Sequence, residues 1–450
     1  MIFDKIVIGA GFAGMLHGLT AARSGQRVLI LEKGKTPGGL IQQAQIAGIS
    51  FDSGAEAFST ATPEFVDWLG QLGLADSIVR PSAKSPVLVT RSGTNKIPKG
   101  VFGVPTSLDD PDLEFLGAEA IALAKKLDER PLPENLDQLS VKELVDSRLG
   151  STFTESLVGP VISGVHGSAP RDLEAASVLA GLVKAMKETG SIVTASRVLR
   201  GDKPAPGSAV ASFEGGMHRL IQTLVRLFEE AGGTLRLNQG VEKVTRLDDG
   251  HFEIEAGELF QGVELVVATS AKAAAKILQS HQELSDSLGE IASLETLLIN
   301  VLVESKALNS FPVGTGALVA EGLGLDVKAT THVNAKWLWV NAALPENQHL
   351  IRFSFREPTE PQNLEAALQA GFSKIYGLEN PKILGQLAVR WEDSLVRATP
   401  GHLGRIQHIR NLAQGLGIEL RGSYLAGNGL LGILKHELAT REGDLVGNAK

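Results

Sequence analysis

The sequence predicts a mixed α/β protein, of α+β type in part, that divides into about three compact units. The first residues pass from a strand pattern through a glycine-rich turn into a helix pattern, which is the order of a parallel βαβ unit. Residues 105–206 carry apolar positions mostly at helical spacing, whereas segments on either side read as strands. A chain of 450 residues is long enough for about three domains of ordinary size.

The opening strand ends in a glycine pattern typical of a Rossmann-like turn. In KIVIGAGFAG, the β-branched run Ile6–Ile8 is followed by Gly9, Gly11 and Gly14 and then by helix-forming residues. Gly9 permits the tight turn, Gly11 lets the backbone approach a pyrophosphate, and Gly14 lets the helix pack closely on the strand. The phosphates would then lie at the helix N-terminus, where free N–H groups favour negative charge.

The second predicted strand ends in an acidic residue placed to bind a ribose. After Gly25 the run RVLILEK reads as a strand and ends at Glu32. A carboxylate at this position accepts hydrogen bonds from a ribose diol and repels a 2′-phosphate. The pattern therefore predicts an adenine dinucleotide with an unphosphorylated ribose. The alternative is a structural βαβ turn that binds no ligand.

The residues after Glu32 distinguish a flavin from a nicotinamide. A second Gly-Gly turn at Gly38 and Gly39 and a hairpin signal around Gly48 precede FDSGAEAF, where a simple nicotinamide enzyme would carry another crossover helix. This pattern resembles the flavin amine oxidase superfamily. In that superfamily the Gly-Gly turn lies along the FAD and the D-x-G segment passes near the flavin.

A second glycine-rich helix start lies near the C-terminus. In GSYLAGNGLLGILKHELATREGDLV, a strand predicted at Tyr424–Ala426 runs into Gly427, Gly429 and Gly432 and then into a helix. A helix start of this kind suits the ribityl and pyrophosphate side of an FAD. The two ends of the chain would then bracket one extended cofactor.

Between these ends the pattern changes from helices to strands. Helical spacing marks LEFLGAEAIALAKKLDE, SVKELVDSRLG and LEAASVLAGLVKAMKETG, whereas PVLVTRSGTNKIP and residues 294–356 read as strands. From Gly215 to Ala256 the pattern is one helix followed by three strands, and ELVVATSA reads as a buried strand. The Pro- and Gly-rich segment Arg200–Ala209 is the predicted linker.

Several segments in the same order narrow the resemblance to the porphyrinogen oxidase family. GPVISGVHGSAPRDLEAASVL resembles the family segment SGV-x-x-G-x-P-x-x-L, and EGGMHRLIQTL resembles its GGM-x-x-L helix start. KATTHVNAKW, the pair Arg390 and Trp391, and GHLGRI resemble further family segments. The resemblance implies an FAD-dependent oxidase of haem biosynthesis. Such an enzyme dehydrogenates protoporphyrinogen IX or coproporphyrinogen III in three two-electron steps, and molecular oxygen reoxidises the flavin.

The same resemblance implies the domain organisation and the cofactor contacts. It implies a fold of flavin amine oxidase type with a discontinuous Rossmann-like FAD-binding domain of residues 1–82, 207–290 and 386–450. A sheet-based substrate domain comprises 83–104 and 291–385, and a helical insertion comprises 105–206. The residues assigned to the cofactor are Gly9, Gly11, Phe12, Ala13, Gly14, Glu32, Lys33, Gly39, Leu40, Gly54, Ala55, Glu56, Ala57, Val241, Trp391, Gly427, Gly432, Ile433 and Leu434. Several of these, such as Leu40, Val241 and Trp391, equally fit plain core positions.

Substrate residues follow from the shape of a porphyrinogen, a wide apolar ring edged by propionates. Its site needs aliphatic and aromatic walls and one or two cations. Lys96, with Arg91 and Lys99, lies in the predicted substrate hairpin, although each also fits an ordinary surface charge. The segment SGVHG is expected to be a loop, in which Gly164 and Gly167 let a flat ring approach the backbone or simply suit the turn.

No catalytic side chain is assigned, because the flavin carries the redox step and the protein positions the macrocycle. His166, within SGVHG, is expected to be a surface or capping histidine. No metal site is expected either, because the ten histidines show neither HExxH nor HxxxH spacing.

The chain departs from the family pattern at two places. Val396, Arg397 and Ala398 stand where the family usually has P-Q-Y, and Leu434, Lys435, His436 and Glu437 stand where it usually continues P-D-C-I. We expect Lys435 and His436 on the outer face of the final helix. These departures leave open another flavin amine oxidase, a polyene desaturase, or a non-catalytic homologue that binds FAD or porphyrin.

Composition limits the partners. The net charge is −8 with both signs scattered, which gives no general attraction to nucleic acid. The absence of cysteine excludes disulfides, thiolate-held iron–sulfur clusters and a cysteine nucleophile. No leader pattern and no run of 18 apolar residues is present, so a cytoplasmic protein is expected. Peripheral membrane contact through the helical insertion and the oligomeric state stay open.

Overall fold

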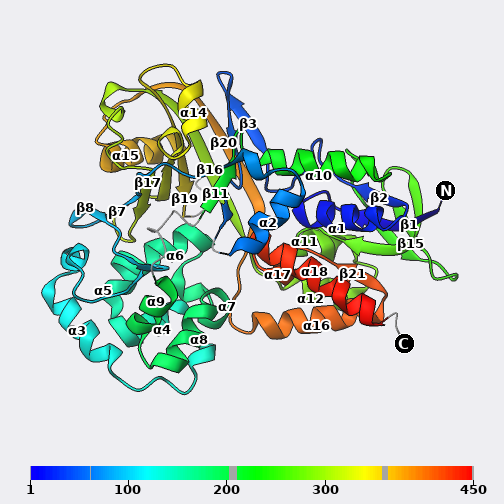
Figure 1. The fold of residues 1–450 in the computed structure, drawn as a ribbon, viewed down its shortest axis with the longest axis horizontal. Coiled ribbons are helices and arrows are strands. Elements are labelled where there is room, and N and C mark those ends of the chain that lie inside the picture. The colour runs from blue at the N-terminus through cyan, green and yellow to red at the C-terminus, as the bar shows by residue number, and fades with distance from the viewer. Residues whose placement is uncertain (1, 61, 202–209, 357–362, 448–450) are drawn as a thin grey trace.

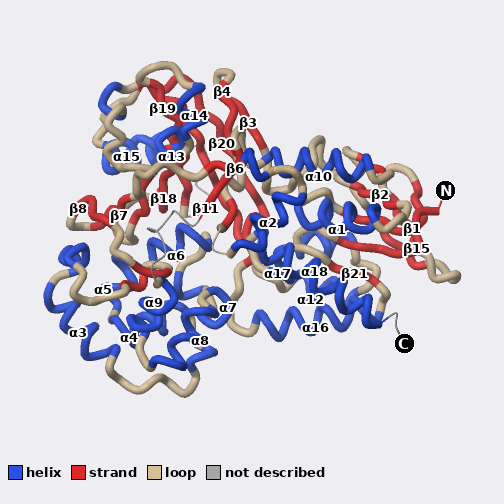
Figure 2. Tube along the Cα trace, viewed as in Figure 1, coloured by secondary structure: helices blue, strands red, loops and turns tan. Residues whose placement is uncertain are grey.

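The computed structural model describes residues 2–60, 62–201, 210–356 and 363–447. Two seven-stranded sheets form its framework (Figure 1). One sheet, with helices on both faces, lies at the end of the molecule that carries both termini, and the other sheet lies beside a group of short helices (Figure 2). The predicted linker falls largely on residues 202–209, which lie outside the described residues.

The first sheet is built around parallel strands, as the βαβ pattern predicts. Its order is β12-β2-β1-β15-β14-β13, and β21 also pairs with β15. The pairs among β12, β2, β1, β15 and β21 are parallel, and β13 and β14 form an antiparallel extension. The bounds are β1 Ile2–Ile8, β2 Val28–Leu31, β12 Thr234–Arg236, β13 Lys243–Arg246, β14 Phe252–Glu255, β15 Leu259–Val267 and β21 Ile418–Leu420.

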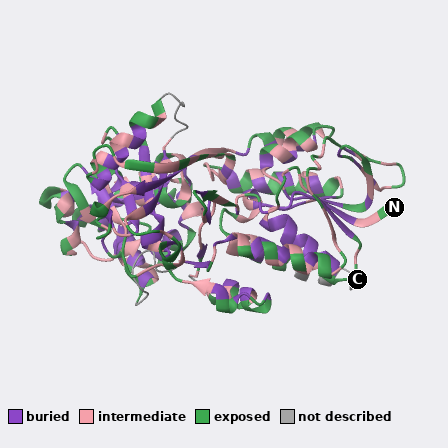
Figure 3. Ribbon diagram, turned by 90° about the horizontal axis from the view of Figure 1, so that it is seen from above, coloured by how far each residue is buried: buried purple, intermediate pink, exposed green. Residues whose placement is uncertain are grey.

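Alternating side chains of these strands feed two separate cores. Val7 and Ile30 face the core that contains α1, α2, α10 and α18, whereas Ile8 and Leu31 face the core that contains α11, α12 and α16. Figure 3 shows these strands as largely buried between helices whose outer faces are exposed. The helices are α1 Phe12–Arg23, α2 Pro63–Gln71, α10 His218–Glu230, α11 Ala271–Ile277, α12 Gln282–Gly289, α16 His402–Gly415 and α18 Leu430–Gly447.

The second sheet contains the strands predicted in residues 83–104 and 294–356. Its order is β20-β16-β19-β18-β17-β7-β8, and helix α15 (Leu364–Tyr376) packs on it through Phe372, which contacts Phe353 edge to face at 4.8 Å. The predicted division between residues 385 and 386 falls inside β20, so the three-domain organisation stays a prediction. The bounds are β7 Val87–Thr90, β8 Gly93–Lys96, β16 Ser293–Glu304, β17 Gly316–Val319, β18 Val327–His332, β19 Gln348–Phe355 and β20 Lys382–Val396, with short helices α13 Val333–Lys336 and α14 Leu338–Ala343.

Small elements connect the two sheets. The hairpin predicted around Gly48 forms, because Ala47 and Gly48 both adopt positive φ between β3 (Gln43–Ile46) and β4 (Ile49–Asp52). A three-stranded sheet joins β5 Phe58–Ser59, β11 Val210–Phe213 and β6 Ile78–Val79, and β9 Gly100–Val101 pairs with β10 Val104–Pro105. Single 3₁₀ turns lie at Ala75–Ser77 and Lys306–Leu308.

The predicted helical region forms a unit with its own apolar core. A capping box between Ser140 and Glu143 starts α4, and Asp128 accepts hydrogen bonds from the first residues of α9. The helices are α3 Ala118–Asp128, α4 Val141–Leu149, α5 Ser151–Phe153, α6 Gly159–His166, α7 Ala175–Val178, α8 Ala180–Thr189 and α9 Ile192–Arg200, with a π turn at Thr154–Val158 and 3₁₀ turns at Pro111–Leu116, Leu136–Gln138 and Pro170–Asp172.

Two local predictions were wrong. The segment SGVHG is not a loop, because Ser163–His166 is the last turn of α6 and Gly167 is its left-handed C-cap at φ +73°. Tyr424–Ala426 is not a strand but part of the helical turn α17, Ser423–Ala426. Gly417 and Gly422, both at positive φ, bound the run Ile418–Leu420, and this run pairs with β15 instead.

Candidate functional site

Two glycine turns from different parts of the chain lie against each other at the carboxyl ends of β1 and β2. The Gly38 N–H donates to the Ala10 carbonyl at 2.8 Å, and Gly11 and Gly38 form an isolated parallel bridge. A Cβ on Gly39 would lie 3.3 Å from Gly11 Cα. The two turns therefore form one surface of backbone atoms beside the start of α1.

The first turn leaves no space for larger residues. Gly9 adopts φ +101°, and a Cβ on Gly14 would lie 1.9 Å from the Gly9 carbonyl oxygen. The predicted roles of these glycines in turn formation and helix packing match this geometry. Phe12 and Ala13 are buried, and Phe12 packs edge to face on Trp68. Their side chains belong to the core, so only the backbone N–H groups at the start of α1 can face a ligand.

Glu32 lies at the end of β2, as predicted. Its carboxylate accepts hydrogen bonds from Ala10 N at 2.8 Å and from Gly34 N at 2.7 Å. The segment that leads to Val241 runs alongside, because Gln239 N donates to the Glu32 carbonyl at 2.8 Å. The structure thus brings Glu32 and half-buried Val241 to one edge, whereas the Lys33 side chain is exposed.

The D-x-G segment lies between the second glycine turn and Trp391. Ala55 N donates to the Leu40 carbonyl at 2.9 Å, and a Cβ on Gly54 would lie 2.1 Å from that same oxygen. Trp391, on β20, donates from Nε1 to the Ser53 carbonyl at 3.3 Å, and its ring lies 3.1 Å from the Gly54 Cβ position. Leu40, Gly54, Ala55 and Trp391, assigned separately in the sequence, are therefore neighbours.

Arg352 on β19 holds this segment from the second sheet, and no role was predicted for this residue. Its guanidinium donates to the carbonyls of Asp52 and Gly54, the latter at 3.1 Å, and its Nη1 lies 3.2 Å from the Glu56 carboxylate. Lys336 forms a second ion pair with Glu56. Burial alone would raise the pKa of Glu56, but the two cations outweigh burial and hold that pKa below its usual value. An arginine within the apolar strand HLIRFSF was the available signal.

Glu56 and Ala57 were assigned to the cofactor, but their side chains have other partners. The Glu56 carboxylate is engaged by Lys336 and Arg352, and Ala57 packs on a core that contains Trp337. Any contact of these two residues with a ligand would therefore come from the backbone.

Asp52 joins the D-x-G segment to the start of α10. Its Oδ1 accepts a hydrogen bond from Met217 N at 2.8 Å, and a Cβ on Gly216 would lie 2.8 Å from the same oxygen. Burial raises the pKa of Asp52 to about 7, although the Met217 N–H and Arg352 act in the opposite direction. The contact joins the FDSG segment to the GGM helix start.

The final helix completes the same edge from the C-terminus. A Cβ on Gly432 would lie 2.3 Å from the Ala426 carbonyl, and Gly427 adopts φ +87° with open space beside it. Asn428 exchanges two hydrogen bonds of 2.9 Å with the backbone of Val396. Ile433 and Leu434 pack into the core shared with α1, so their side chains are core residues.

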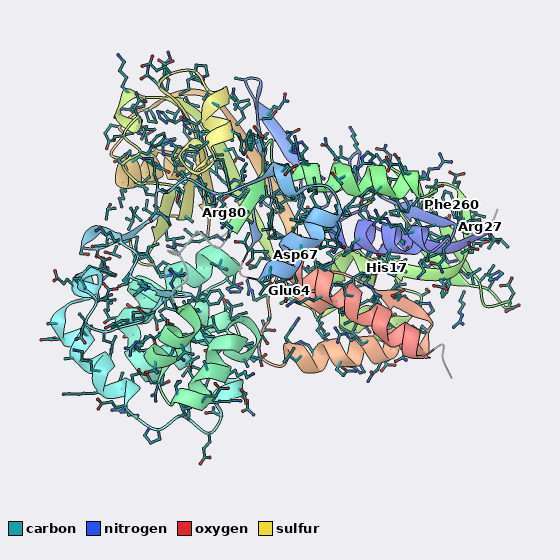
Figure 4. All side chains as sticks on the ribbon, viewed as in Figure 1. His17, Arg27, Glu64, Asp67, Arg80 and Phe260 are labelled. Atoms are coloured by element: carbon teal, nitrogen blue, oxygen red, sulfur yellow. The ribbon has the colours of Figure 1, made fainter. Side chains whose placement is uncertain are left out.

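Helix α18 is also joined to α1 by a hydrogen-bonded pair. His17 on α1, labelled in Figure 4, lies 3.1 Å from Glu437, which also accepts from Arg421 Nε at 3.1 Å. Lys435 is exposed beside Glu64, as expected for the outer face. His436 is half-buried, and burial together with Arg421 and Arg410 lowers its pKa to about 4.

The predicted substrate residues are not brought together. Lys96 lies on β8, at the opposite edge of the second sheet from Trp391 on β20. Six strand spacings separate these edges, or about 30 Å. Arg91 borders a separate open hollow of about 450 Å³ at the same far edge, and Lys99 precedes the β9–β10 hairpin.

Gly164 and Gly167 lie where α6 packs on the second sheet. A Cβ on Gly164 would lie 2.6 Å from Leu318, and a Cβ on Gly167 would lie 2.9 Å from Leu395. His166 is half-buried against the Phe102 ring at 5.8 Å, and burial lowers its pKa. The two glycines allow close packing of α6, and a further role beside a substrate stays a prediction.

Comparisons with known proteins match nearly the whole chain. The family described as flavin containing amine oxidoreductase matches residues 13–429. The coproporphyrinogen III oxidase of Mycobacterium leprae is 25% identical over 430 residues, which cover 90% of each chain. The coproporphyrinogen III oxidase of Bacillus subtilis is 22% identical over 456 residues, which cover 95% of this chain and 94% of the relative.

Solved structures share the fold over the same extent. A protein of Exiguobacterium sp. 255-15 assigned as a protoporphyrinogen oxidase superposes with a TM-score of 0.84 at 21% identity, covering 98% of both chains. The cyclohexylamine oxidase of Brevibacterium oxydans superposes with a TM-score of 0.68 at 16% identity, covering 98% of this chain and 99% of the other. The fold is therefore shared by proteins that act on different substrates.

Proposed function

The chain belongs to the family of flavin-containing amine oxidoreductases, and from that premise we propose that it is a porphyrinogen oxidase of haem biosynthesis. Membership confirms the predicted fold class, the FAD cofactor and the oxidoreductase class. The observation that carries the narrower proposal is the match of 90% or more of both chains to coproporphyrinogen III oxidases. The proposed reaction removes hydrogen from coproporphyrinogen III or protoporphyrinogen IX, and molecular oxygen is the proposed final acceptor.

The residues present suit an FAD. The paired turns at Gly11 and Gly39 expose backbone where any side chain would intrude, which suits a closely approaching pyrophosphate. The first N–H groups of α1 have no partner within the helix and would bind the phosphates. Each Glu32 oxygen accepts one backbone hydrogen bond and can accept a second from a ribose hydroxyl.

The chain's part in the reaction is to position rather than to transfer protons. Bound FAD supplies the hydride acceptor for the dehydrogenation. Arg352 holds the backbone of Asp52 and Gly54 in place, and Trp391, on the same sheet, packs on Gly54. These contacts fix the D-x-G segment between the two sheets, where small shifts would misplace a macrocycle relative to its acceptor.

The direct test uses both porphyrinogens separately. Purified protein loaded with FAD is incubated in air with chemically reduced coproporphyrinogen III or protoporphyrinogen IX, and porphyrin fluorescence and peroxide release are followed. We expect one or both to be oxidised well above the rate in buffer. Failure with both would overturn the proposal, and peroxide release with amines or a polyene instead would favour the wider superfamily.

Membrane contact and location are separate proposals. Among the described residues, no helix has both the length and the apolar character needed to cross a membrane. We propose a cytoplasmic enzyme, and binding of the purified protein to lipid vesicles would test peripheral contact.

A further inference from the structure

Where α6 packs on the second sheet, Leu294 and Leu395 form an apolar wall beside Gly167. The positions that meet at Gly167 are Leu395 and Leu294, whose Cδ1 atoms lie 2.9 and 3.0 Å from a Cβ placed on Gly167. Leu294 and Leu395 pair across β16 and β20, and both keep part of their surface exposed. Val165 on the last turn of α6 is 56% exposed. The wall therefore offers aliphatic surface to a ligand.

Two irregularities in the sheet adjoin this wall. The register of β18 with β19 shifts between Val327 and Ala329, which makes Lys328 the extra residue of a β-bulge. The register of β16 with β20 shifts between Leu294 and Thr296, so that Trp391 and Leu395 flank a second bulge. Bulges re-aim side chains and are common beside active sites. The bulge between β16 and β20 separates Leu395 of the wall from Trp391, which packs on the D-x-G segment.

Lys328 places a cation at the wall, and none of the described residues pairs a carboxylate with it. Its side chain is buried, with 7% of the residue exposed, and its Nζ lies 3.8 Å from the Gly167 Cβ position. The Gly167 carbonyl, at 3.2 Å, is the acceptor that the described residues offer it. Burial, reinforced by nearby Arg356, lowers the pKa of Lys328 to about 8.

Arg397 places a second cation two residues beyond Leu395, within about 7 Å along the chain. Its backbone N–H donates to the Ala292 carbonyl at 2.8 Å, which holds it beside the start of β16. The residue is half-buried, and its Nε is fully buried without a hydrogen-bond partner. Across the described parts of the chain, no acid or carbonyl pairs with this guanidinium.

Arg148 and Arg421, both buried, have several partners each, although Arg148 Nε has none. Arg148 donates to several backbone carbonyls, and Arg421 pairs with both Glu419 and Glu437. Burying a cation without an acceptor is costly, so an unpaired arginine and an ammonium with a single carbonyl on one wall indicate an anionic ligand. The family pattern has another residue at the position of Arg397, so this cation distinguishes the chain from the family pattern.

We propose that Lys328 and Arg397 bind carboxylates of the substrate while Leu294 and Leu395 contact its ring. The inference rests on the proposed porphyrinogen oxidase function and adds a preference between its two candidate substrates. A macrocycle with four propionates can engage both cations with less constraint on its orientation than one with two propionates and two vinyl groups. The enzyme should therefore prefer coproporphyrinogen III to protoporphyrinogen IX.

The test measures binding of coproporphyrin III and protoporphyrin IX to the FAD-loaded protein by fluorescence, alongside steady-state kinetics. The variants are Arg397→Gln, Arg397→Lys, Lys328→Met and the double variant. Matched controls are Lys187→Met and Arg226→Gln, which remove exposed, ion-paired cations elsewhere. Flavin absorbance and circular dichroism report folding.

We expect Arg397→Gln and Lys328→Met each to weaken coproporphyrin binding and raise KM about tenfold or more, with kcat and flavin content nearly unchanged. Protoporphyrin binding should fall as well, and Arg397→Lys should recover part of the loss. Lys328→Met also loses the bond to Gly167, so Arg397→Gln, at a half-exposed position, remains decisive if Lys328→Met misfolds.

Two failures are distinguishable. If wild-type protein oxidises a porphyrinogen but folded Arg397→Gln binds coproporphyrin within twofold of wild type, the carboxylate site is wrong and the proposed function stands. If wild-type protein neither binds nor oxidises a porphyrinogen, both proposals are overturned.

Discussion

The charge of Asp52 depends strongly on its surroundings. Its pKa of about 7 lies above the value of 3.8 that an exposed aspartate has, so the folded state holds a proton that the unfolded chain releases at lower pH. The stability that this proton contributes is complete below about pH 4 and is lost as the pH rises to about 7. Asp52→Asn keeps an acceptor for Met217 N without this loss.

We therefore expect Asp52→Asn to gain stability over wild type as the pH rises from 4 to 8, by on the order of a few kcal/mol. Urea unfolding at several pH values measures the difference. Asp67→Asn, which changes an exposed carboxylate on α2 (Figure 4), should show no such trend. If the free energies of unfolding of Asp52→Asn and wild type follow parallel pH profiles, the inference that the buried Asp52 carboxyl holds a proton is contradicted.

Glu32 supports a second prediction. Arginine at this position removes the acceptor for two backbone N–H groups and for a ribose, so Glu32→Arg should be purified with less than about a tenth of the flavin of wild type. Glu32→Gln retains one acceptor oxygen and should lose less. Glu258→Arg, at an exposed position, is the matched control. Full flavin absorbance in Glu32→Arg would remove Glu32 from the cofactor site.

For single residues, the sequence predicts the roles that depend on local spacing. The glycines and Glu32 were predicted because their roles depend on one turn and two strand ends. Arg352 was missed because its partners, the carbonyls of Asp52 and Gly54, come close only through the packing of a distant strand. Phe12 and Leu434 were assigned by position, and their burial in one core could not be derived from their neighbours in sequence.

Among the elements, the turn between β1 and α1 tolerates the least change. Gly14→Ala places a methyl group 1.9 Å from the Gly9 carbonyl oxygen, and backbone cannot yield as a side chain can. We expect it to destabilise the protein by several kcal/mol or to abolish folding, as seen in soluble yield and thermal unfolding. Gly70→Ala, also helical but with open space beside it, should be neutral or stabilising. Equal thermal midpoints for Gly14→Ala and wild type would contradict the tight packing of Gly14 against Gly9.

Periodicity predicted most elements, and its errors have identifiable causes. Helix α10 shows Leu220, Ile221, Leu224 and Phe228 buried at helical spacing, so it was correctly predicted. The segment SGVHG was taken as a loop because two glycines suggested one. Pro160 in the first turn and Gly167 at the C-cap instead make α6 a well-terminated helix. Glycine inside a helix here serves close packing against Leu318 rather than a turn.

For the whole molecule, the cofactor edge depends on both ends of the chain. Truncation after Gly429 removes α18, and with it Leu434 from the core of α1 and Glu437 from His17. We expect a protein that lacks flavin and aggregates, although every residue of the N-terminal turn is present. Truncation after Gly447 should retain the yellow cofactor. Flavin binding by the shorter protein would show that the N-terminal turn acts alone.

The order of motifs predicted that an FAD site is assembled from both termini, and the fold agrees with it. The contacts between the two sheets could not be predicted, because they depend on the registers of β16, β19 and β20. The proposed domains stay a prediction, since β20 belongs to the second sheet and yet its Trp391 contacts the D-x-G segment, which follows β4 in the N-terminal part of the chain.

The pairing of β1 with β15 also has a consequence for synthesis. β1 leaves the ribosome first, but its neighbour ends at Val267 and the covering helix α18 starts at Leu430. At about 5–20 residues per second, these partners follow roughly 13–50 s and 20–80 s later. The N-terminal strand therefore waits with an open edge and an uncovered helix while translation continues. The proposed FAD site is therefore complete only after α18 has been synthesised, because Gly432 and its neighbours supply one edge of it.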